Sequence, residues 1–368
     1  MHYHIILTEN CNSECKYCYE KSLEEAEINQ NTNFKLDFSS PERISIDIDK
    51  LNQFIKKDKQ AVIIFYGGEP LLEVDKIKEI IDKISVKFRM QTNGKLLDKL
   101  PIDYLKKIDK ILISIDGDKK RTDYQKGVGT YEMVINNLRN ARKLGYKGEF
   151  IARMTISGFS DIYKQVNHLL SLNLFDSIHW QLDAGFYKSD FDKNKFNRFV
   201  KEYNKEITRL IRLWFNRMKT GKVLRIYPFI GITESLLKKK KTSLRCGAGY
   251  EGYAITTNGK IIACPIMNCI EDFVAGSIED NPKDLKKFYI TGPCLKCEIK
   301  DICGGRCLYS NKAKLWPKEG EELICKTIKH LIKELEKILP KVKKLISKQV
   351  IKPDYFDYEK YFGPEIIP

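Results

Sequence analysis

With 368 residues, 42% of them hydrophobic and 31% charged, the chain has the composition of a globular protein, and its net charge of +16 permits an acidic partner such as nucleic acid. No apolar run approaches the length of a membrane span and the polar start at His2 and His4 is no signal peptide, so we expect a cytoplasmic protein with no membrane partner. Eleven cysteines without a secretion signal argue against a disulfide scaffold and favour metal or redox chemistry.

The first half of the chain, up to about Phe186, alternates short β-rich runs with helical stretches. Strands are predicted over Tyr3–Leu7, Val62–Tyr66, Phe88–Gln91, Ile111–Ile115, Phe150–Thr155 and Ile178–Leu182. This alternation predicts an α/β fold with a parallel sheet. Periodicity alone allows either a partial (β/α)6 barrel or an open doubly wound sheet.

Three cysteines follow the first predicted strand, at Cys11, Cys15 and Cys18. They are one ligand short of a closed tetrahedral site. An iron–sulfur cluster held by only three cysteines leaves one iron open to another ligand. The alternative is a zinc site completed by a histidine from elsewhere, with His2 and His4 close in sequence.

Unusual polar and glycine residues lie on, or directly after, each of the other predicted strands. In chain order they are Gly67-Gly68-Glu69-Pro70, Thr92-Asn93-Gly94, Ser114 with Asp116 and Gly117, Arg153, and Asp183. The carboxyl ends of parallel strands meet at one edge, where such folds place their active sites. Core packing does not require this pattern, so we expect a functional site at this edge.

The second half begins with a predicted amphipathic helix over Phe191–Met218 and then becomes rich in cysteine. The later cysteines are Cys246, Cys264, Cys269, Cys294, Cys297, Cys303, Cys307 and Cys325. Zinc and iron–sulfur sites are both chemically possible for them. From Thr327 a lysine-rich helix is predicted, interrupted at Pro340.

The N-terminal loop, Cys11-x3-Cys15-x2-Cys18, resembles that of radical SAM enzymes, and the Gly67–Pro70 segment resembles their motif for the methionyl amine of S-adenosylmethionine. Segments 91–94 and 114–117 resemble signatures of the peptide-modifying branch of this superfamily. The later cysteines, with Gly259 but without Cys269, resemble the seven-cysteine SPASM motif. The resemblance covers Tyr3 to Cys325, nearly the whole chain.

The resemblance implies a partial (β/α)6 TIM-like barrel with a C-terminal SPASM extension. The expected domains are a barrel over 1–190, a helical connector over 191–245, a SPASM domain over 246–326 and a C-terminal helix and tail over 327–368. It implies S-adenosylmethionine and three [4Fe-4S] clusters as cofactors. Cys11, Cys15 and Cys18 would hold the first cluster; Cys246, Cys264 and Cys307 the nearer auxiliary cluster, with Cys269 as a candidate fourth ligand; and Cys294, Cys297, Cys303 and Cys325 the outer one.

The cofactor-binding residues that the resemblance implies are Tyr17, Gly67, Gly68, Glu69, Pro70, Asn93, Ser114, Asp116 and Arg153. Tyr17 would pack on the adenine, Ser114 and Asp116 would bind the ribose, and Arg153 would bind the carboxylate. One-electron reduction of the first cluster would cleave S-adenosylmethionine, and the 5′-deoxyadenosyl radical would take hydrogen from the substrate.

The sequence differs from the sulfatase-maturing relatives at one position, and this difference leaves the type of reaction open. Sulfatase-maturing relatives carry an aspartate after the second SPASM cysteine, whereas Cys264 precedes Pro265 here. Asp183, Glu271 and Asp272 are the candidate acid or base residues. The chain starts almost at the first strand, so we expect no N-terminal peptide-recognition domain.

We expect modification of a peptide or protein substrate by crosslinking, epimerisation or oxidation, with crosslinking of a ribosomal peptide as first choice. Ferredoxin or flavodoxin would supply the electrons. The alternatives are a radical SAM enzyme acting on a small metabolite and a zinc-stabilised basic nucleic-acid-binding protein. The lysines lie beside apolar helical positions, which favours a solvated surface over a nucleic-acid interface.

Overall fold

The computed structural model describes residues 1–18, 34–183, 191–314 and 317–368. It separates into two compact units: unit 1 comprises Met1–Ala152 and Gly247–Tyr289, and unit 2 comprises Arg153–Cys246 and Ile290–Pro368. The domain limits expected at 190, 245 and 326 remain predictions, and the first lies outside the described residues.

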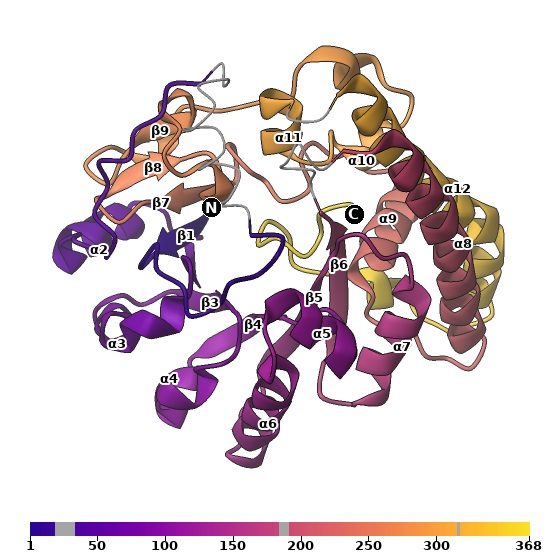
Figure 1. The fold of residues 1–368 in the computed structure, drawn as a ribbon, viewed down its shortest axis with the longest axis horizontal. Coiled ribbons are helices and arrows are strands. Elements are labelled where there is room, and N and C mark those ends of the chain that lie inside the picture. Colours follow the sequence, from indigo (N-terminus) through magenta and orange to yellow (C-terminus); the bar gives the residue numbers. More distant parts are fainter. Residues whose placement is uncertain (19–33, 184–190, 315–316) are drawn as a thin grey trace. The chain divides into compact units, whose positions relative to one another are not determined.

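Unit 1 is built on a largely parallel sheet (Figure 1). Its strands are β1 (His2–Ile6), β2 (Val62–Tyr66), β3 (Lys87–Thr92), β4 (Ile108–Ser114), β7 (Gly252–Ile255), β8 (Lys260–Ile262) and β9 (Val274–Ser277), in the order β4-β3-β2-β1-β7-β8-β9. The β1–β2, β2–β3, β3–β4 and β1–β7 pairs are parallel, whereas β8 is antiparallel to both of its neighbours. Five parallel strands thus end at one edge, and the predicted site segments lie at the ends of four of them, β1 to β4.

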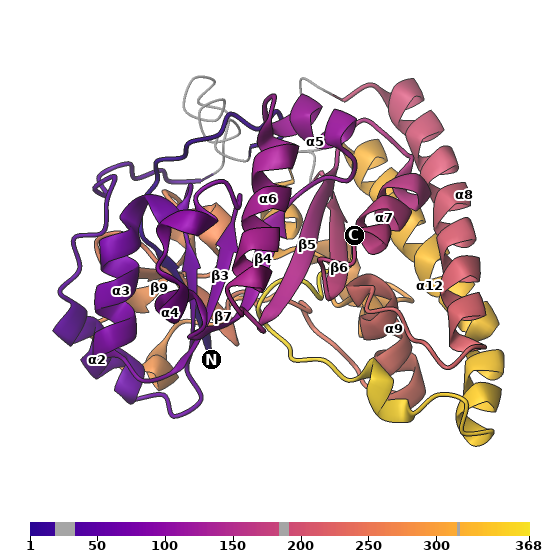
Figure 2. The ribbon, with the colours of Figure 1, turned by 90° about the horizontal axis from the view of Figure 1, so that it is seen from below.

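The helices of unit 1 are α2 (Ile48–Lys56), α3 (Val74–Lys83), α4 (Ile102–Leu105), α5 (Lys119–Lys126) and α6 (Thr130–Lys143). Helices α2, α3 and α6 each bury a set of apolar side chains, whereas α5 buries polar ones. In α2, Asp47 caps the N-terminus through the backbone amides of Asp49 and Lys50. Phe54 of the same helix is fully buried and meets Tyr3 of β1 edge-on at 5.4 Å. Helices α2 and α3 pack against each other (Figure 2).

Unit 2 combines the last strand with a group of helices. Its elements are α7 (Ile162–Ser171), β6 (Ser177–Leu182), α8 (Lys193–Met218), α9 (Tyr227–Lys238), α10 (Lys300–Cys303), α11 (Leu308–Ala313) and α12 (Lys318–Ser347), while β5 (Glu149–Ile156) begins in unit 1 and ends in unit 2. Helices α8 and α12 run side by side in both ribbon views. Trp214 of α8 is fully buried and contacts Phe229 of α9 at 5.4 Å, so aromatic side chains join these helices.

The six predicted strands are all present, with bounds that differ by up to three residues, and the predicted α/β class with a parallel sheet is confirmed. One expectation was wrong. Helix α12 begins at Lys318 and continues through Pro340. Pro340 is exposed, so the carbonyl that loses its hydrogen-bond donor meets water while the buried face of α12 stays continuous. No helix in the described ranges is long and apolar enough to cross a membrane.

Candidate active site

The loop that carries Cys11, Cys15 and Cys18 is fixed to unit 1 along its whole length. At its start, the backbone amides of Gly68 and Glu69 donate to the carbonyls of Thr8 and Asn10, each at 2.9 Å. Further on, the amide of Lys16 donates to the carbonyl of Gln125 at 3.0 Å, and the amide of Cys18 to that of Cys15 at 3.0 Å. Cys11 is exposed and the other two cysteines are half-buried.

The glycine pair at the end of β2 makes room for this loop. A Cβ atom on Gly67 would lie 2.3 Å from the Thr8 carbonyl oxygen, and one on Gly68 would lie 2.4 Å from those of Glu9 and Asn10. Both are backbone atoms, so a side chain would displace the loop. The sequence suggested that these glycines admit a ligand. The structure adds another reason for them, since they admit the backbone of the cysteine loop.

Glu69 joins the ends of β2 and β3 from the interior. Its carboxylate is fully buried and accepts hydrogen bonds from the Thr92 hydroxyl and the Asn93 amide, both at 2.7 Å, and from the Leu71 amide at 3.0 Å. Burial raises the pKa of Glu69 above its ordinary value, although these hydrogen bonds oppose the shift. Pro70 follows as the first residue of a 3-10 helix over Pro70–Glu73.

Asn93 extends this network to the cysteines. Its side-chain nitrogen lies 2.7 Å from Asn12 Oδ1, 3.3 Å from Ser13 Oγ and 3.9 Å from Cys11 Sγ. Its side-chain oxygen accepts from the amide of Lys95 at 2.9 Å. Asn93 therefore orients the first turn of the cysteine loop, a role that sequence spacing does not show.

A buried charged group lies beneath the other end of the loop. The Tyr17 hydroxyl donates to Asp116 Oδ2 at 2.6 Å, and Asp116 is fully buried. Lys126 is also buried, with its Nζ 3.7 Å from Cys15 Sγ and 5.1 Å from the centre of the Tyr17 ring. Burial lowers the pKa of Lys126, but Asp116 and Cys15 outweigh burial, so this pKa lies above its ordinary value.

Sequence reasoning missed Lys126 because the chain is rich in lysine. A signal was present in α5, whose sequence KKRTDYQK has no apolar face. A helix without an apolar face must bury polar residues wherever it packs, and here it buries Arg121, Thr122, Gln125 and Lys126. Ser114 is the last residue of β4, the strand that precedes α5 in the chain, and its side chain is half-buried.

Arg153 lies in unit 2, in the part of β5 that belongs to that unit. Its guanidinium donates to Gln181 Oε1 at 3.0 Å and to the Gly363 carbonyl at 3.3 Å, and lies 3.4 Å from His179 Nδ1. His179 in turn contacts the Ile366 carbonyl at 3.1 Å, and burial together with Arg153 lowers the pKa of His179 well below its ordinary value. Arg153 therefore anchors the C-terminal tail, and its expected bond to a carboxylate remains a prediction.

The three candidate acid or base residues lie in different units. Asp183, in unit 2, accepts a hydrogen bond from the Ser157 hydroxyl at 2.7 Å. Glu271 and Asp272, in unit 1, bind the segment before α2. Glu271 forms an ion pair with Lys35, and Asp272 accepts from the Lys35 amide at 2.9 Å.

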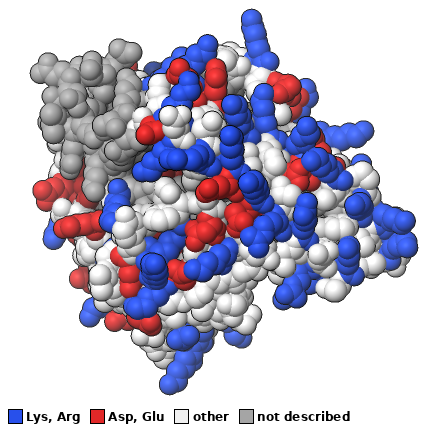
Figure 3. Space-filling view, turned by 45° about the vertical axis from the view of Figure 1, so that its right-hand side comes forward, with Lys and Arg blue, Asp and Glu red and all other residues white. Residues whose placement is uncertain are grey.

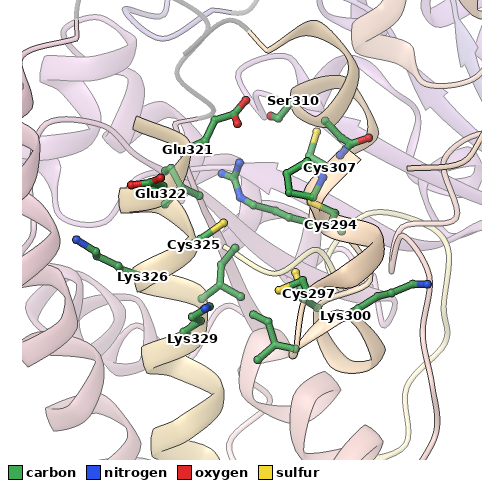
Figure 4. A pocket seen from close by; sticks show the side chains of 18 of the residues that line it. Cys294, Cys297, Lys300, Cys307, Ser310, Glu321, Glu322, Cys325, Lys326 and Lys329 are labelled. Carbon is green, nitrogen blue, oxygen red and sulfur yellow. The ribbon is translucent and has the colours of Figure 1, made fainter. Parts of the chain in front are cut away.

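Five of the later cysteines line one pocket of unit 2, with a volume of about 520 Å³. They are Cys294, Cys297, Cys303, Cys307 and Cys325. Figure 4 shows Cys325 on α12 facing Cys294 and Cys297 on the opposite wall. The four cysteines expected to hold the outer cluster therefore share this pocket, together with Cys307.

Burial makes three of these thiols harder to ionise. It raises the pKa of Cys303 to about 11 and also raises the pKa values of Cys294 and Cys325. A bound metal group reverses this effect, because it stabilises the thiolate. The soft, all-sulfur donor set therefore fits an iron–sulfur group.

The remaining cysteines are divided between the units. Cys246 belongs to unit 2, while Cys264 and Cys269 belong to unit 1. Cys269 has a left-handed backbone with φ of 66°, and its carbonyl accepts from the Asp37 amide at 2.8 Å. Across the described ranges, no group of three or more His, Cys, Asp or Glu side chains is arranged around a single metal ion.

Comparison with known proteins identifies the N-terminal part. Residues 5–170 match the radical SAM superfamily. The chain is 23% identical over 335 residues to the radical SAM cyclopropyl synthase TigE of Paramaledivibacter caminithermalis, covering 83% of this chain and 67% of TigE. It is 24% identical over 347 residues to the cysteine-type anaerobic sulfatase-maturating enzyme of Clostridium perfringens, covering 82% of this chain and 86% of that one.

The same fold occurs in a solved structure. The structure of native anSMEcpe with bound AdoMet and the Cp18Cys peptide aligns with a TM-score of 0.70 at 18% identity, over 93% of this chain and 99% of that one. The cysteine loop, the strand-end segments and these similarities all indicate the same assignment for the N-terminal domain. Residues 5–170 therefore form a radical SAM domain, and the chain is an enzyme whose homologues include the anaerobic sulfatase-maturating enzymes.

Proposed function

We propose that this enzyme binds S-adenosylmethionine at the carboxyl edge of β1–β4 and removes a hydrogen atom from a peptide or protein substrate. The observation that carries the proposal is the three-cysteine loop, anchored to Gly68, Glu69 and Asn93 at that edge. Similarity to a sulfatase-maturating enzyme, and to the structure of anSMEcpe with its bound peptide, supports the substrate class. A cytoplasmic location remains part of the proposal.

The residues at this edge fit a three-cysteine iron–sulfur cluster. Cys11, Cys15 and Cys18 are sulfur donors within one loop, and the Lys126 ammonium beside Cys15 compensates negative charge on the thiolates. When bound, the cluster and S-adenosylmethionine together supply a 5′-deoxyadenosyl radical after one-electron reduction.

The protein itself supplies position and shielding. Glu69 fixes the ends of β2 and β3, and Asn93 fixes the first turn of the loop, so the three sulfurs keep their spacing. Tyr17 and Asp116 are already hydrogen-bonded to each other. In our proposal this pair faces the nucleoside, with Tyr17 packing on the adenine and Asp116 binding the ribose beside Ser114.

The later cysteines are proposed to hold two auxiliary [4Fe-4S] clusters. Cys294, Cys297, Cys303 and Cys325 would hold the outer one, which the shared pocket supports. Cys246, Cys264 and Cys307 would hold the nearer one, with Cys269 as a possible fourth ligand. Among the candidate bases we favour Asp183, because the Ser157 hydroxyl orients its carboxylate. Glu271 and Asp272 are instead bonded to Lys35.

Within this class we favour crosslinking of a peptide over epimerisation or oxidation. The relative TigE is named as a cyclopropyl synthase, a bond-forming activity, and Pro265 stands where sulfatase-maturing relatives carry an aspartate. A low-potential ferredoxin or flavodoxin is the proposed electron donor.

The decisive experiment compares the wild-type protein with Cys15→Ala, both purified without oxygen. The wild type is expected to be brown, to contain about twelve irons at about four per cluster, and to release 5′-deoxyadenosine with dithionite. The Cys15→Ala variant is expected to keep about eight irons, at about four per cluster, and to form no 5′-deoxyadenosine with dithionite. A colourless zinc protein, or unchanged cleavage in Cys15→Ala, would refute the proposal.

A further inference from the structure

The pocket that holds five cysteines in unit 2 reaches the surface. Among the cysteines that line it, Cys325 of α12 is exposed, whereas Cys303 of α10 is buried. In Figure 4 the side chains of Lys326 and Lys300 extend outward on opposite sides of the cysteines, with Lys329 below Cys325. A redox group held here would lie close to solvent.

The lining of this pocket is strongly basic. The basic residues are Lys300, Arg306, Lys314, Lys318, Lys326 and Lys329, and the acidic ones are Glu321 and Glu322. Six basic and two acidic side chains give a surplus of four positive charges. Glu298, which forms an ion pair with Lys329 at 2.7 Å, reduces the surplus to three.

An exposed apolar residue lies between two of the pocket's cysteines in the sequence. Leu295 stands between Cys294 and Cys297 and is 50% exposed. A small apolar centre with a charged rim is typical of the weak, short-lived interfaces through which electron-transfer proteins meet. Figure 3 shows one face of the molecule, on which many lysine and arginine side chains lie with acidic ones among them.

We propose that Lys300, Lys326 and Lys329, here called the lysine rim, dock a small acidic protein that carries single electrons. This inference rests on the proposed function, because it takes the cysteine pocket to hold an iron–sulfur group. The docked carrier is oxidised by one electron, and the group bound by Cys294, Cys297, Cys303 and Cys325 is reduced by one. No proton is transferred and no covalent bond forms or breaks, so the step needs only the carrier as reductant.

The pocket favours an electron carrier over an acidic substrate peptide. A substrate must reach the S-adenosylmethionine site, which we place in unit 1, whereas a carrier needs only to approach a redox group near the surface. Lys326 and Lys329 are one helical turn apart on α12 and adjoin Cys325, so their charges act where the electron enters.

The test uses the whole iron-loaded enzyme with the variant Lys300→Glu/Lys326→Glu/Lys329→Glu. The matched control is Lys341→Glu/Lys344→Glu/Lys348→Glu, which makes the same charge change at exposed positions at the other end of α12. The probes are a reduced flavodoxin and a plant-type ferredoxin. Calorimetry measures their Kd at low and high salt, and carbodiimide crosslinking joins rim lysines to carrier carboxylates for mapping by mass spectrometry.

We expect at least about a tenfold rise in Kd for the rim variant, a weaker salt dependence, and wild-type crosslinks at Lys326 or Lys329. The ratio of carrier-driven to dithionite-driven 5′-deoxyadenosine formation should fall in parallel. The control should behave as the wild type.

The docking proposal is overturned if neither carrier binds the wild type in a salt-dependent way, if rim and control variants bind alike, or if the rim variant loses a substrate peptide instead of the carrier. If the wild type lacks iron or dithionite-driven cleavage, the proposed function itself has failed.

Discussion

The two cysteine regions of this enzyme are built in opposite ways. The N-terminal loop places three cysteines within eight residues and is fixed by backbone hydrogen bonds to the strand ends. The C-terminal pocket gathers its cysteines from a 3-10 helix over Gly292–Lys296, from α10 and from α12. The first region is therefore a short loop attached to the ends of the strands. The second region exists only when the helices that carry its cysteines pack together.

Their charges differ as well. Lys126 places a buried cation 3.7 Å from Cys15, while most cations of the C-terminal pocket are exposed lysines at its rim. A buried charge acts on the bound group with little screening, whereas exposed charges act mainly on approaching partners. We therefore expect the N-terminal cation to tune the cluster and the rim to select a carrier.

The largest contrast should come from Cys303→Ala. Cys303 is 8% exposed and ends α10, so its replacement removes a buried side chain and a proposed ligand of the outer cluster. We expect about a third of the iron to be lost, at about four irons per cluster, together with a clear fall in Tm. Iron analysis and anaerobic thermal melts measure this. The same fall in Tm for Cys15→Ala would contradict the comparison.

The next effect should come from Lys126→Met. The variant removes the buried ammonium group that Asp116 and Cys15 stabilise, and we expect a loss of about 3 kcal/mol of stability. We also expect a more negative reduction potential for the N-terminal cluster alone, since the ammonium favours the added electron. A redox titration followed by electron paramagnetic resonance checks this, with Lys126→Arg as the variant that keeps the charge. An unchanged potential would show that Lys126 is only structural.

A smaller effect is expected for Gly68→Ala. The added Cβ would meet two backbone carbonyl oxygens at 2.4 Å, and the loop must shift, at a cost of about 2 kcal/mol. The control is Gly129→Ala, whose Cβ would have open space and whose only strain is a φ of 83°. Binding of S-adenosylmethionine, followed by calorimetry, should weaken in the first variant only. If both variants bind S-adenosylmethionine equally well, the close approach of the loop backbone to Gly68 is not needed for binding.

The smallest effect concerns the surface contact beside Cys269. Lys260 holds Asp37 at 2.6 Å and lowers its pKa below the ordinary value of 3.8. A lowered pKa means that the stabilisation is present above pH 3.8 and is lost as the pH falls through the lowered pKa. The Tm difference between wild type and Asp37→Asn should therefore be small at pH 7 and shrink below pH 4. A difference that grows in acid would refute this sign.

The sequence alone determined the strands, the cysteine loop and the order of the strand-end segments. These features follow from short-range patterns: apolar runs set the strands, and parallel strands bring their carboxyl ends to one edge. The four cysteines expected to hold the outer cluster share the C-terminal pocket with Cys307, and the ligand set itself stays a prediction.

Only the tertiary structure decided what the charged residues do. Buried Glu69 links the ends of β2 and β3 by hydrogen bonds, Arg153 binds the C-terminal tail, and Lys126 lies beside Cys15. The helix over Lys318–Ser347 likewise continues past Pro340 because its packed face is uninterrupted. A charged side chain has the same sequence signature on a surface and in the interior, and only the elements that pack around it determine its partners.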